Sequence, residues 1–357
     1  MSDVDPEPTV IAPGVRERFS ACFEPPTLAR GFANPWPHEP LPGLKGVLRW
    51  KTSANTARPP NYRPSTLPLP ADPLADLQRM NQQDTRIFWI GHASFLIETG
   101  GVRLVVDPIF GELPFVKKRV TRAACSAEQL GAVDAVLLTH GHRDHFDTAS
   151  LRALARLGQG RTRFVVPSGL SSALPPVCRP FHELGWWQFM RIGPVQIHLV
   201  PAQHWHQRGP WDRNTCLWGG YVIDGGHRIY HSGDTGYFEG FRAIGEVFGG
   251  VDVACLPLGA YEPVWFMRSQ HMTPGDSLAA YRDLNATHFV GMHWGAFDLS
   301  NETLDAGPRW LLDVLDESDA LAKERVHVLV PGGAVGLSGA PGRAIARRQH
   351  AFSPDTR

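Results

Sequence analysis

The sequence predicts an α/β fold in which two β-sheets are flanked by helices. From residue 86 onward, eleven short runs rich in β-branched and aromatic residues are bounded by Gly, Pro or Asp, a pattern typical of β-strands. Several of these runs follow one another directly, and later ones alternate with helical patterns, which favours two sheets over one doubly wound parallel sheet. The apolar content of 43% is enough for a substantial core.

The expected elements follow from local patterns in chain order. The predicted strands are residues 86–90, 93–99, 102–107, 134–139, 163–167, 195–201, 217–224, 227–232, 251–257, 287–293 and 326–330. The predicted helices are residues 148–158, 274–284 and 308–324. Thr273 precedes Pro274, and this pair is a helix-start signal because Ser or Thr caps the first turn and proline suits the first helical position.

The first part of the chain has a different composition. Residues 1–73 hold 15 of the 31 prolines, which fix φ and lack an amide donor, so we expect an extended and irregular path there. We predict a flexible tail at residues 1–30, a Pro-rich extended segment packed on the core at residues 31–85, one folded domain at residues 86–340, and a second flexible tail at residues 341–357.

Composition gives no indication of several classes of protein. Lys and Arg balance Asp and Glu at 35 each, so no basic surface for nucleic acid is indicated. The five scattered cysteines form no C-x-x-C pair, and the acidic, proline-bearing N-terminus is unlike a secretory signal. No apolar run is long enough to span a bilayer. We expect a cytoplasmic protein, with peripheral contact with a membrane surface left open.

The stretch LLTHGHRDHFD at residues 137–147 follows an apolar run and predicts part of a metal site. His140 and His142 lie two residues apart, so in an extended segment both imidazoles project to the same side. Asp144 and His145 follow where a helix begins and would point to a second position. Imidazole and carboxylate are suitable ligands for zinc. The alternative is a histidine-rich polar turn.

Two zinc ions require more donors than this stretch supplies. His204, Asp234 and His293 each close an apolar, strand-like run, where a residue lies at the edge of a sheet. Any one of them alone would be an ordinary residue, but three such positions favour a centre for two metal ions.

The motif H-G-H-R-D-H with these downstream donors resembles the metallo-β-lactamase-fold hydrolase superfamily. Within it, the chain looks like the N-acyl-phosphatidylethanolamine-hydrolysing phospholipase D family. The segments that carry this resemblance are NPWP (34–37), WIGHASFLIE (89–98), DPIF (107–110), PAQHW (201–205), LWGGYVI (217–223), GDTGYF (233–238), LPLGAYEPVWFM (256–267), QHMTP (270–274) and HWGAF (293–297). The resemblance implies a four-layer αββα sandwich for residues 86–340.

The resemblance also implies roles for individual residues. One zinc ion would be held by His140, His142 and His204, a second by Asp144, His145 and His293, and Asp234 would bridge the two. Asp144 and Asp234 would thus serve catalysis as well as binding. His271 would act on the reacting phosphate with Gln270 beside it. Arg143 departs from the family pattern, which has an aromatic residue there, and would either contact the substrate phosphate or be solvated.

Four further residues have weaker assignments. Asp107 and Asp147 would hold ligand imidazoles in place, or would simply cap turns. His92 is interpreted as a structural residue of a strand turn. His231 and the other remaining histidines are not assigned to the centre.

The predicted activity is zinc-dependent hydrolysis of a phospholipid, N-acyl-phosphatidylethanolamine or a related lipid, to phosphatidic acid and an N-acylethanolamine. One alternative is a lactonase or another hydrolase of this fold that acts on a small phosphorylated metabolite. A second alternative is a binding or regulatory scaffold without catalysis. No nucleic-acid partner is expected.

Overall fold

The computed structural model describes residues 6–24, 26–113, 118–318, 324–340 and 345–353, and these form two eight-stranded sheets. The order in the first sheet is β16 (Ile345–Ala351), β15 (Leu329–Ser338), β2 (Thr85–Gly91), β3 (Ser94–Thr99), β4 (Val102–Val106), β5 (Ala135–Leu137), β6 (Arg163–Pro167) and β7 (Phe181–Leu184). The order in the second is β1 (Glu7–Pro8), β8 (Gln188–Ile192), β9 (Val195–Val200), β10 (Gly220–Asp224), β11 (Arg228–His231), β12 (Val251–Pro257), β13 (Ala286–Met292) and β14 (Val326–His327).

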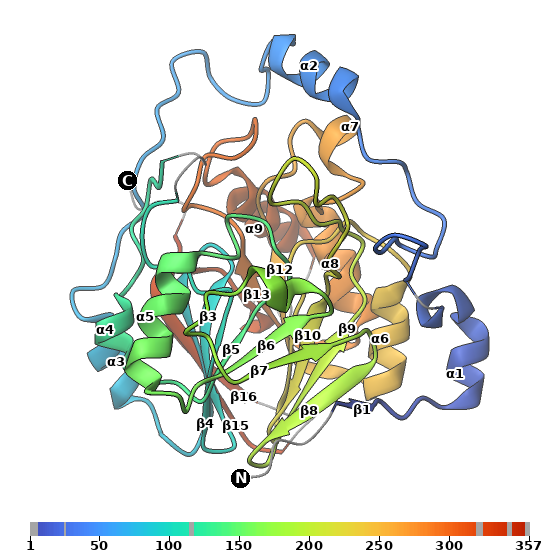
Figure 1. Ribbon diagram of the computed structural model, residues 1–357. Coiled ribbons are helices and arrows are strands. Elements are labelled where there is room, and N and C mark those ends of the chain that lie inside the picture. The colour runs from blue at the N-terminus through green and yellow to red at the C-terminus, as the bar shows by residue number, and fades with distance from the viewer. Residues whose placement is uncertain (1–5, 25, 114–117, 319–323, 341–344, 354–357) are drawn as a thin grey trace.

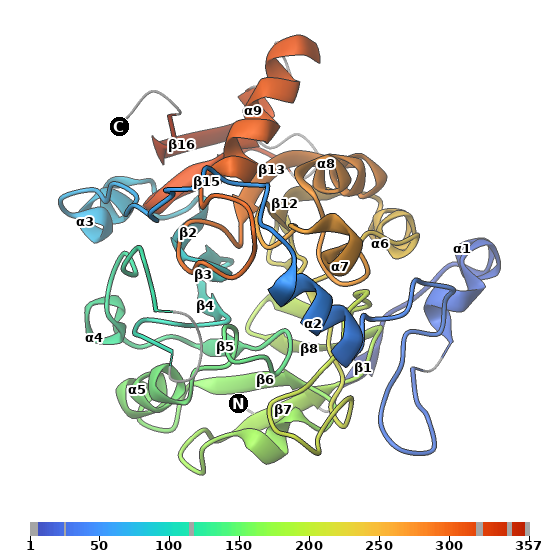
Figure 2. The ribbon, with the colours of Figure 1, turned by 90° about the horizontal axis from the view of Figure 1, so that it is seen from above.

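Helices cover the outer face of each sheet (Figures 1 and 2). On the side of the first sheet lie α3 (Pro73–Arg79), α4 (Ala127–Leu130) and α5 (Thr148–Gly158). On the side of the second sheet lie α6 (Gly240–Phe248), α8 (Pro274–Asp283) and α9 (Ala306–Ser318). The remaining helical elements are α1 (Pro13–Arg18), α2 (Leu44–Thr52), α7 (Val264–Met267) and the short 3₁₀ turns at Ser20–Phe23 and Leu170–Ala173. The predicted αββα sandwich is confirmed.

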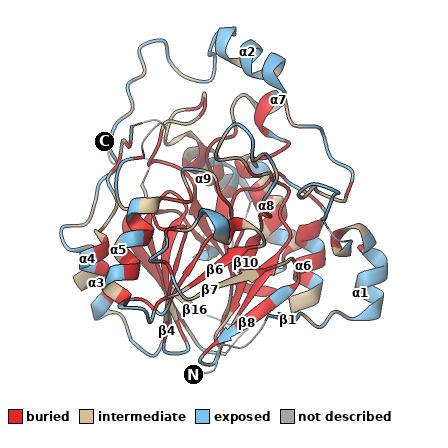
Figure 3. Ribbon diagram, viewed as in Figure 1, coloured by how far each residue is buried: buried red, intermediate tan, exposed pale blue. Residues whose placement is uncertain are grey.

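The alternation of side chains along a strand builds two cores from one sheet. In β2, Ile87 and Trp89 belong to the core that joins the two sheets, whereas Phe88 and Ile90 belong to the core beneath α4 and α5. All four side chains are fully buried. Figure 3 shows that most of both sheets is buried, whereas β7 and β8 are partly exposed.

Strands of both sheets end at one edge of the sandwich. β4 and β5 are parallel neighbours, as are β11, β12 and β13, and β2 and β9 run in the same direction as β4 and β11 because each is separated from it by one antiparallel strand. The loops that leave β2, β4 and β5 therefore lie at one edge of the first sheet, and those that leave β9, β11 and β13 lie at one edge of the second. Contacts of His140 with Asp234 and of His293 with His92 bring the two edges together.

Two expected tails contain regular structure. The predicted tail at residues 1–30 includes α1, and β1 pairs with β8; the predicted tail at residues 341–357 includes β16, which pairs with β15. Strand pairing supplies the partners that short polar segments lack in isolation, and the flexibility of the two tails stays a prediction. Residues 1–5, 25, 341–344 and 354–357 lie outside the described residues.

The segment at residues 31–85 is extended only in part. It contains α2 and α3 in addition to extended stretches. α3 begins with Pro73 behind the capping carboxylate of Asp72, which accepts a hydrogen bond from the backbone N–H of Ala75 at 3.0 Å. Proline is favoured in a first helical turn, so a proline-rich composition does not exclude short helices. The domain boundaries at residues 30, 85 and 340 stay a prediction.

No helix in the described ranges is long and apolar enough to cross a lipid bilayer.

Candidate metal centre

The loop after β5 presents four of the predicted ligands because it turns back on itself. The backbone N–H groups of His145 and Phe146 both donate to the carbonyl of His142, at 3.1 and 2.9 Å. Gly141 is required in this loop, since a Cβ there would lie 2.1 Å from the ring of His206. The loop ends at Asp147, whose carboxylate accepts the N–H groups of Ala149 and Ser150 and caps α5.

The first group of donors contains His140, His142, His204 and Asp234. Nδ1 of His142 lies 3.0 Å from Nε2 of His140 and 3.0 Å from Nε2 of His204. Oδ2 of Asp234 lies 3.8 and 3.9 Å from the same two Nε2 atoms. Three imidazoles and one carboxylate thus converge on one point from the ends of three strands, β5, β9 and β11.

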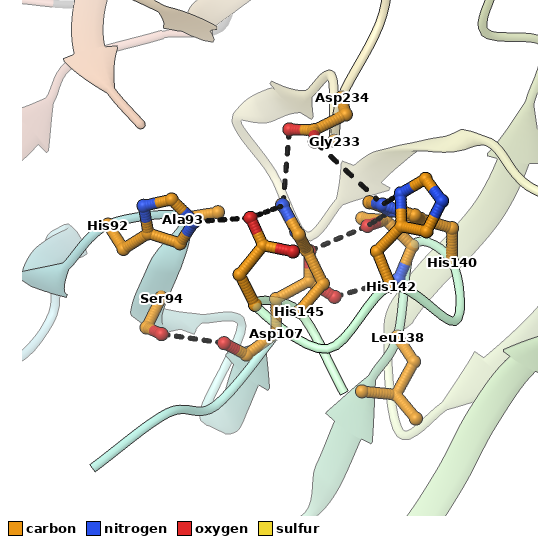
Figure 4. A network of polar contacts seen from close by, with 12 residues as sticks. His92, Ala93, Ser94, Asp107, Leu138, His140, His142, His145, Gly233 and Asp234 are labelled. Atoms are coloured by element: carbon orange, nitrogen blue, oxygen red, sulfur yellow. Dashed lines mark hydrogen bonds and ion pairs between the residues drawn. The ribbon is translucent and has the colours of Figure 1, made fainter. Parts of the chain in front are cut away.

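The second group contains His92, Asp144, His145 and His293. Oδ1 of Asp234 reaches it as well, 3.1 Å from Nε2 of His145 and 3.0 Å from Nε2 of His293. The two oxygens of Asp234 therefore face different groups, as a bridging carboxylate does. Figure 4 shows Asp234 with contacts to both His145 and His140.

These donors fit metal ions better than they fit one another. Nδ1 of His142 faces two other nitrogens at 3.0 Å, yet a single ring nitrogen has either one proton or one lone pair to share. In the second group, the single Oδ1 atom of Asp234 is buried between Nε2 of His145 and Nε2 of His293, and neither contact has hydrogen-bond geometry. Buried polar atoms of this kind point to a bound ion. Nitrogen and carboxylate donors match zinc.

Burial favours the neutral form of the three imidazoles in the first group. It holds the pKa of His140 and of His204 well below the usual range, and neighbouring imidazoles add to the effect. Burial also lowers the pKa of His142 to about 4. Neutral imidazoles have the free lone pair that a metal requires.

In the second group, neighbouring charged groups shift the pKa values in the direction opposite to burial. Burial would lower the pKa of His145, but Asp234 and Asp107 raise it well above the ordinary value. Burial would raise the pKa of Asp234, but His145 and His293 lower it. These shifts favour a protonated His145 beside an ionised Asp234. A metal ion would take the place of the proton on Nε2 of His145.

Hydrogen bonds from residues outside the two groups orient the donor side chains. The carboxylate of Asp107 accepts the N–H of Thr139 at 2.8 Å, its hydroxyl at 2.6 Å and Nδ1–H of His145 at 2.7 Å. Nδ1–H of His204 donates to the carbonyl of Gln270 at 3.1 Å. Asp107 thus makes the contact that a positioning role requires. The carboxylate of Asp147 caps α5, which is the alternative that the sequence left open.

His271 and Gln270 lie beside the donor groups. Nδ1 of His271 is 3.9 Å from Oδ2 of Asp234, and a third group of possible ligands combines Asp234, His271 and His293. Burial lowers the pKa of His271 to about 4. His271, Gln270 and Arg143 all line a cavity of about 330 Å³ that opens beside the donors. Arg143 also donates from Nη2 to the carbonyl of Arg208 at 3.2 Å.

His92, which the sequence analysis interpreted as a structural residue, lies in the second donor group. Its Nε2 lies 3.3 Å from Oδ2 of Asp144, and its carbonyl accepts the backbone N–H of His293 at 3.0 Å. His92 and His293 both have positive φ, 55° and 59°, which non-glycine residues rarely adopt and which is common at functional sites. The sequence signal available for this role was the position of His92 in the turn between two apolar, strand-like runs in WIGHASF. His231, by contrast, donates to the carbonyl of Ala93 and belongs to neither group.

The sandwich and its paired donor groups define a metal-dependent hydrolase of the metallo-β-lactamase fold. A family model described as "Beta-lactamase superfamily domain" matches residues 102–294. The chain belongs to this superfamily. It is also 30% identical over 258 residues to a metal-dependent hydrolase of Rubrobacter xylanophilus, a match that covers 71% of this chain and 96% of that protein.

Two further relatives have more specific names. The chain is 30% identical over 315 residues to N-acyl-phosphatidylethanolamine-hydrolyzing phospholipase D 1 of Caenorhabditis elegans, covering 82% of this chain and 88% of that protein. It is 32% identical over 242 residues to the mitochondrial enzyme of that name in Saccharomyces cerevisiae, covering 64% of this chain and 51% of the yeast protein.

A solved structure supports the fold. Igni18, a metallo hydrolase of the archaeon Ignicoccus hospitalis, has a TM-score of 0.53 at 24% identity, covering 72% of this chain and 99% of that one.

Proposed function

We propose that the chain is a zinc-dependent phosphodiesterase of the phospholipase D type. It would hydrolyse N-acyl-phosphatidylethanolamine or a related phospholipid to phosphatidic acid and an N-acylethanolamine. The observation that supports it most is Asp234, whose two oxygens face two separate donor groups beside a pocket that contains His271. The proposed lipid substrate is taken from the name of the Caenorhabditis elegans relative.

The donors divide between two zinc ions. His140, His142 and His204 would hold one, Asp144, His145 and His293 the other, and Asp234 would contact both. Two adjacent zinc ions supply an activated water and Lewis acidity at a phosphate.

The chain's own groups would bind and orient the diester. His271 lies between the donors and the pocket, so its ring can donate a hydrogen bond to a phosphoryl oxygen. The side-chain oxygen of Gln270 accepts a hydrogen bond from Nε1 of Trp205, which leaves the amide N–H₂ for the substrate. Arg143 would place its guanidinium at the polar wall of the pocket, where it attracts an anionic substrate.

We further propose contact with a membrane surface through α2. Its described side chains are all outside the core, and Leu44 and Leu48 are 89% and 64% exposed. Lys45, Arg49 and Lys51 add positive charge to the same short helix. Apolar and basic residues together suit an anionic bilayer interface. The five cysteines are free and buried, which fits a reducing compartment, so we propose the cytoplasmic side of a membrane.

The test is product identification by mass spectrometry with a phospholipid panel that includes N-acyl-phosphatidylethanolamine. We expect phosphatidic acid and N-acylethanolamine, loss of both products after chelation, and recovery when zinc is added back. A cyclic lactone serves as the competing substrate. Hydrolysis of the lactone with no cleavage of any lipid would contradict the proposal and support the lactonase alternative, and no turnover of either would support the non-catalytic scaffold.

A further inference from the structure

The pocket beside the metal centre has an apolar wall assembled from three distant parts of the chain. Trp50 comes from α2, Ala260, Phe266 and Met267 come from the segment around α7, and Leu299 comes from the loop after β13. In Figure 1, α2 lies at the top of the molecule beside α7. The N-terminal part of the chain thus supplies one wall of a pocket whose ligands all come from the sandwich.

The indole of Trp50 is held in place by a hydrogen bond and by a ring contact. Its Nε1–H donates to Oδ1 of Asn301 at 2.9 Å, and its ring lies 4.7 Å from the ring of Phe266. α2 has no buried residue, and these contacts help to attach it, together with the Arg49 guanidinium, which lies 4.3 Å from the centre of the Trp265 ring. An indole fixed in this way presents a rigid apolar surface to the pocket.

The segment after α2 is fastened to the same loop. Arg58 is mostly buried, with 15% of its side chain exposed, and its guanidinium donates to the carbonyls of Asn301 at 2.6 Å and Glu302 at 2.9 Å and to the carboxylate of Asp298 at 3.0 Å. The amide of Asn55 donates to the carbonyl of Asn301 at 3.1 Å. We call residues 44–62 the roof segment.

Glu302 connects this loop to the pocket wall. Its buried carboxylate accepts the backbone N–H of Ala260 at 2.6 Å and that of Glu262 at 3.0 Å. The roof segment, the loop at residues 298–302 and the turn before α7 therefore form one hydrogen-bonded unit, and the position of Trp50 is determined by that unit rather than by the exposed helix.

We propose that Trp50 is a specificity-determining residue, whose indole selects phosphodiesters that carry an apolar group next to the phosphate. The inference rests on the proposed phosphodiesterase function and refines it. An apolar group under the indole leaves water, which favours binding in proportion to the area covered. Because Trp50 is already ordered by Asn301 and Phe266, little conformational entropy is lost when the substrate binds.

The experiment compares two diesters with the same leaving group, methyl and hexyl p-nitrophenyl phosphate, on the zinc-loaded full-length protein. The wild type is expected to prefer the hexyl diester in kcat/KM. Trp50→Ala should reduce this preference by roughly 10-fold, mainly through a higher KM for the hexyl diester. Trp50→Phe should retain most of it. Trp211→Ala is the control, since Trp211 is 93% exposed and does not line the pocket.

A second readout does not depend on turnover. Calorimetry should show that hexyl phosphate binds the wild type more tightly than methyl phosphate and that Trp50→Ala loses this difference at unchanged melting temperature. Equal slowing of both diesters, or an unchanged binding difference, would overturn the assignment of Trp50. If the wild type hydrolyses neither diester, the phosphodiesterase proposal fails, while the binding comparison still decides the role of Trp50.

Discussion

Oδ2 of Asp107 lies 2.7 Å from Nδ1 of His145, and neither side chain is exposed to solvent. The same carboxylate is held by the N–H and hydroxyl of Thr139. Asp107 therefore holds the proton of His145 on Nδ1 and leaves Nε2 free to face Asp234 and a metal ion.

The first prediction is that Asp107→Asn weakens zinc binding by roughly 10–100-fold, as is usual for loss of a carboxylate behind a ligand imidazole. The amide would offer an N–H₂ toward Nδ1 and favour the tautomer with its proton on Nε2. Competition with a chromophoric chelator measures the affinity. Asp147→Ala is the control, because it removes the cap of α5 and about 1 kcal/mol of stability but no contact to a ligand. Equal loss of zinc affinity in both variants would contradict the role of Asp107.

The second prediction concerns Asp234, whose oxygens face both donor groups. Asp234→Asn should release at least one equivalent of zinc and abolish nearly all hydrolysis, because a neutral amide holds two cations far less well than a carboxylate does. Elemental analysis after gel filtration gives the zinc content. A variant that keeps two zinc ions and full turnover would show that Asp234 does not bridge them.

The third prediction separates His271 from the ligands. His271→Ala should keep two zinc ions and slow turnover by roughly 10²–10⁴-fold, the range for a positioned hydrogen-bonding or acid–base group. Zinc content and steady-state rate are measured on the same preparation. Since His271 also lies near Asp234 and His293, loss of one zinc equivalent would instead make it a ligand.

The fourth prediction is a pH effect away from the centre. Burial would raise the pKa of Asp305, but hydrogen bonds from Arg309 Nε at 2.6 Å and the Thr303 hydroxyl at 3.0 Å lower it below the ordinary value. A carboxyl group whose pKa is lower in the folded state stabilises the fold above its unfolded pKa, and this contribution disappears as the pH falls.

Asp305→Asn should accordingly reduce the free energy of unfolding by about 0.5–1 kcal/mol at neutral pH. The difference from the wild type should shrink below about pH 4, where the unfolded carboxyl group takes up a proton. Urea denaturation of both proteins at both pH values measures this difference. A difference that stays constant or grows in acid would rule out the assignment.

Local sequence patterns were sufficient where neighbours in the chain decide the structure. The helix predicted at residues 148–158 begins and ends where α5 does, since Asp147 caps it and its apolar residues recur at helical spacing. Likewise, Thr273 and Asp276 form the reciprocal cap that starts α8. The seven predicted metal ligands lie in the two donor groups because each follows a strand that ends at the same sheet edge.

Other features depend on contacts between distant residues, which no local pattern contains. His92 joins the second donor group only because the turn after β2 lies against the end of β13. Trp50 reaches the pocket because Asn301, which is far away in the chain, binds its indole. β16 is a polar strand, IARRQHA, that is ordered by pairing with β15 rather than by an apolar run of its own.

The most direct test of the central claim is anomalous diffraction at the zinc absorption edge from crystals of the purified protein. We predict two anomalous peaks, one surrounded by His140, His142 and His204 and the other by Asp144, His145 and His293, with Asp234 between them. A single peak, or peaks bound by other side chains, would contradict the two-ion centre.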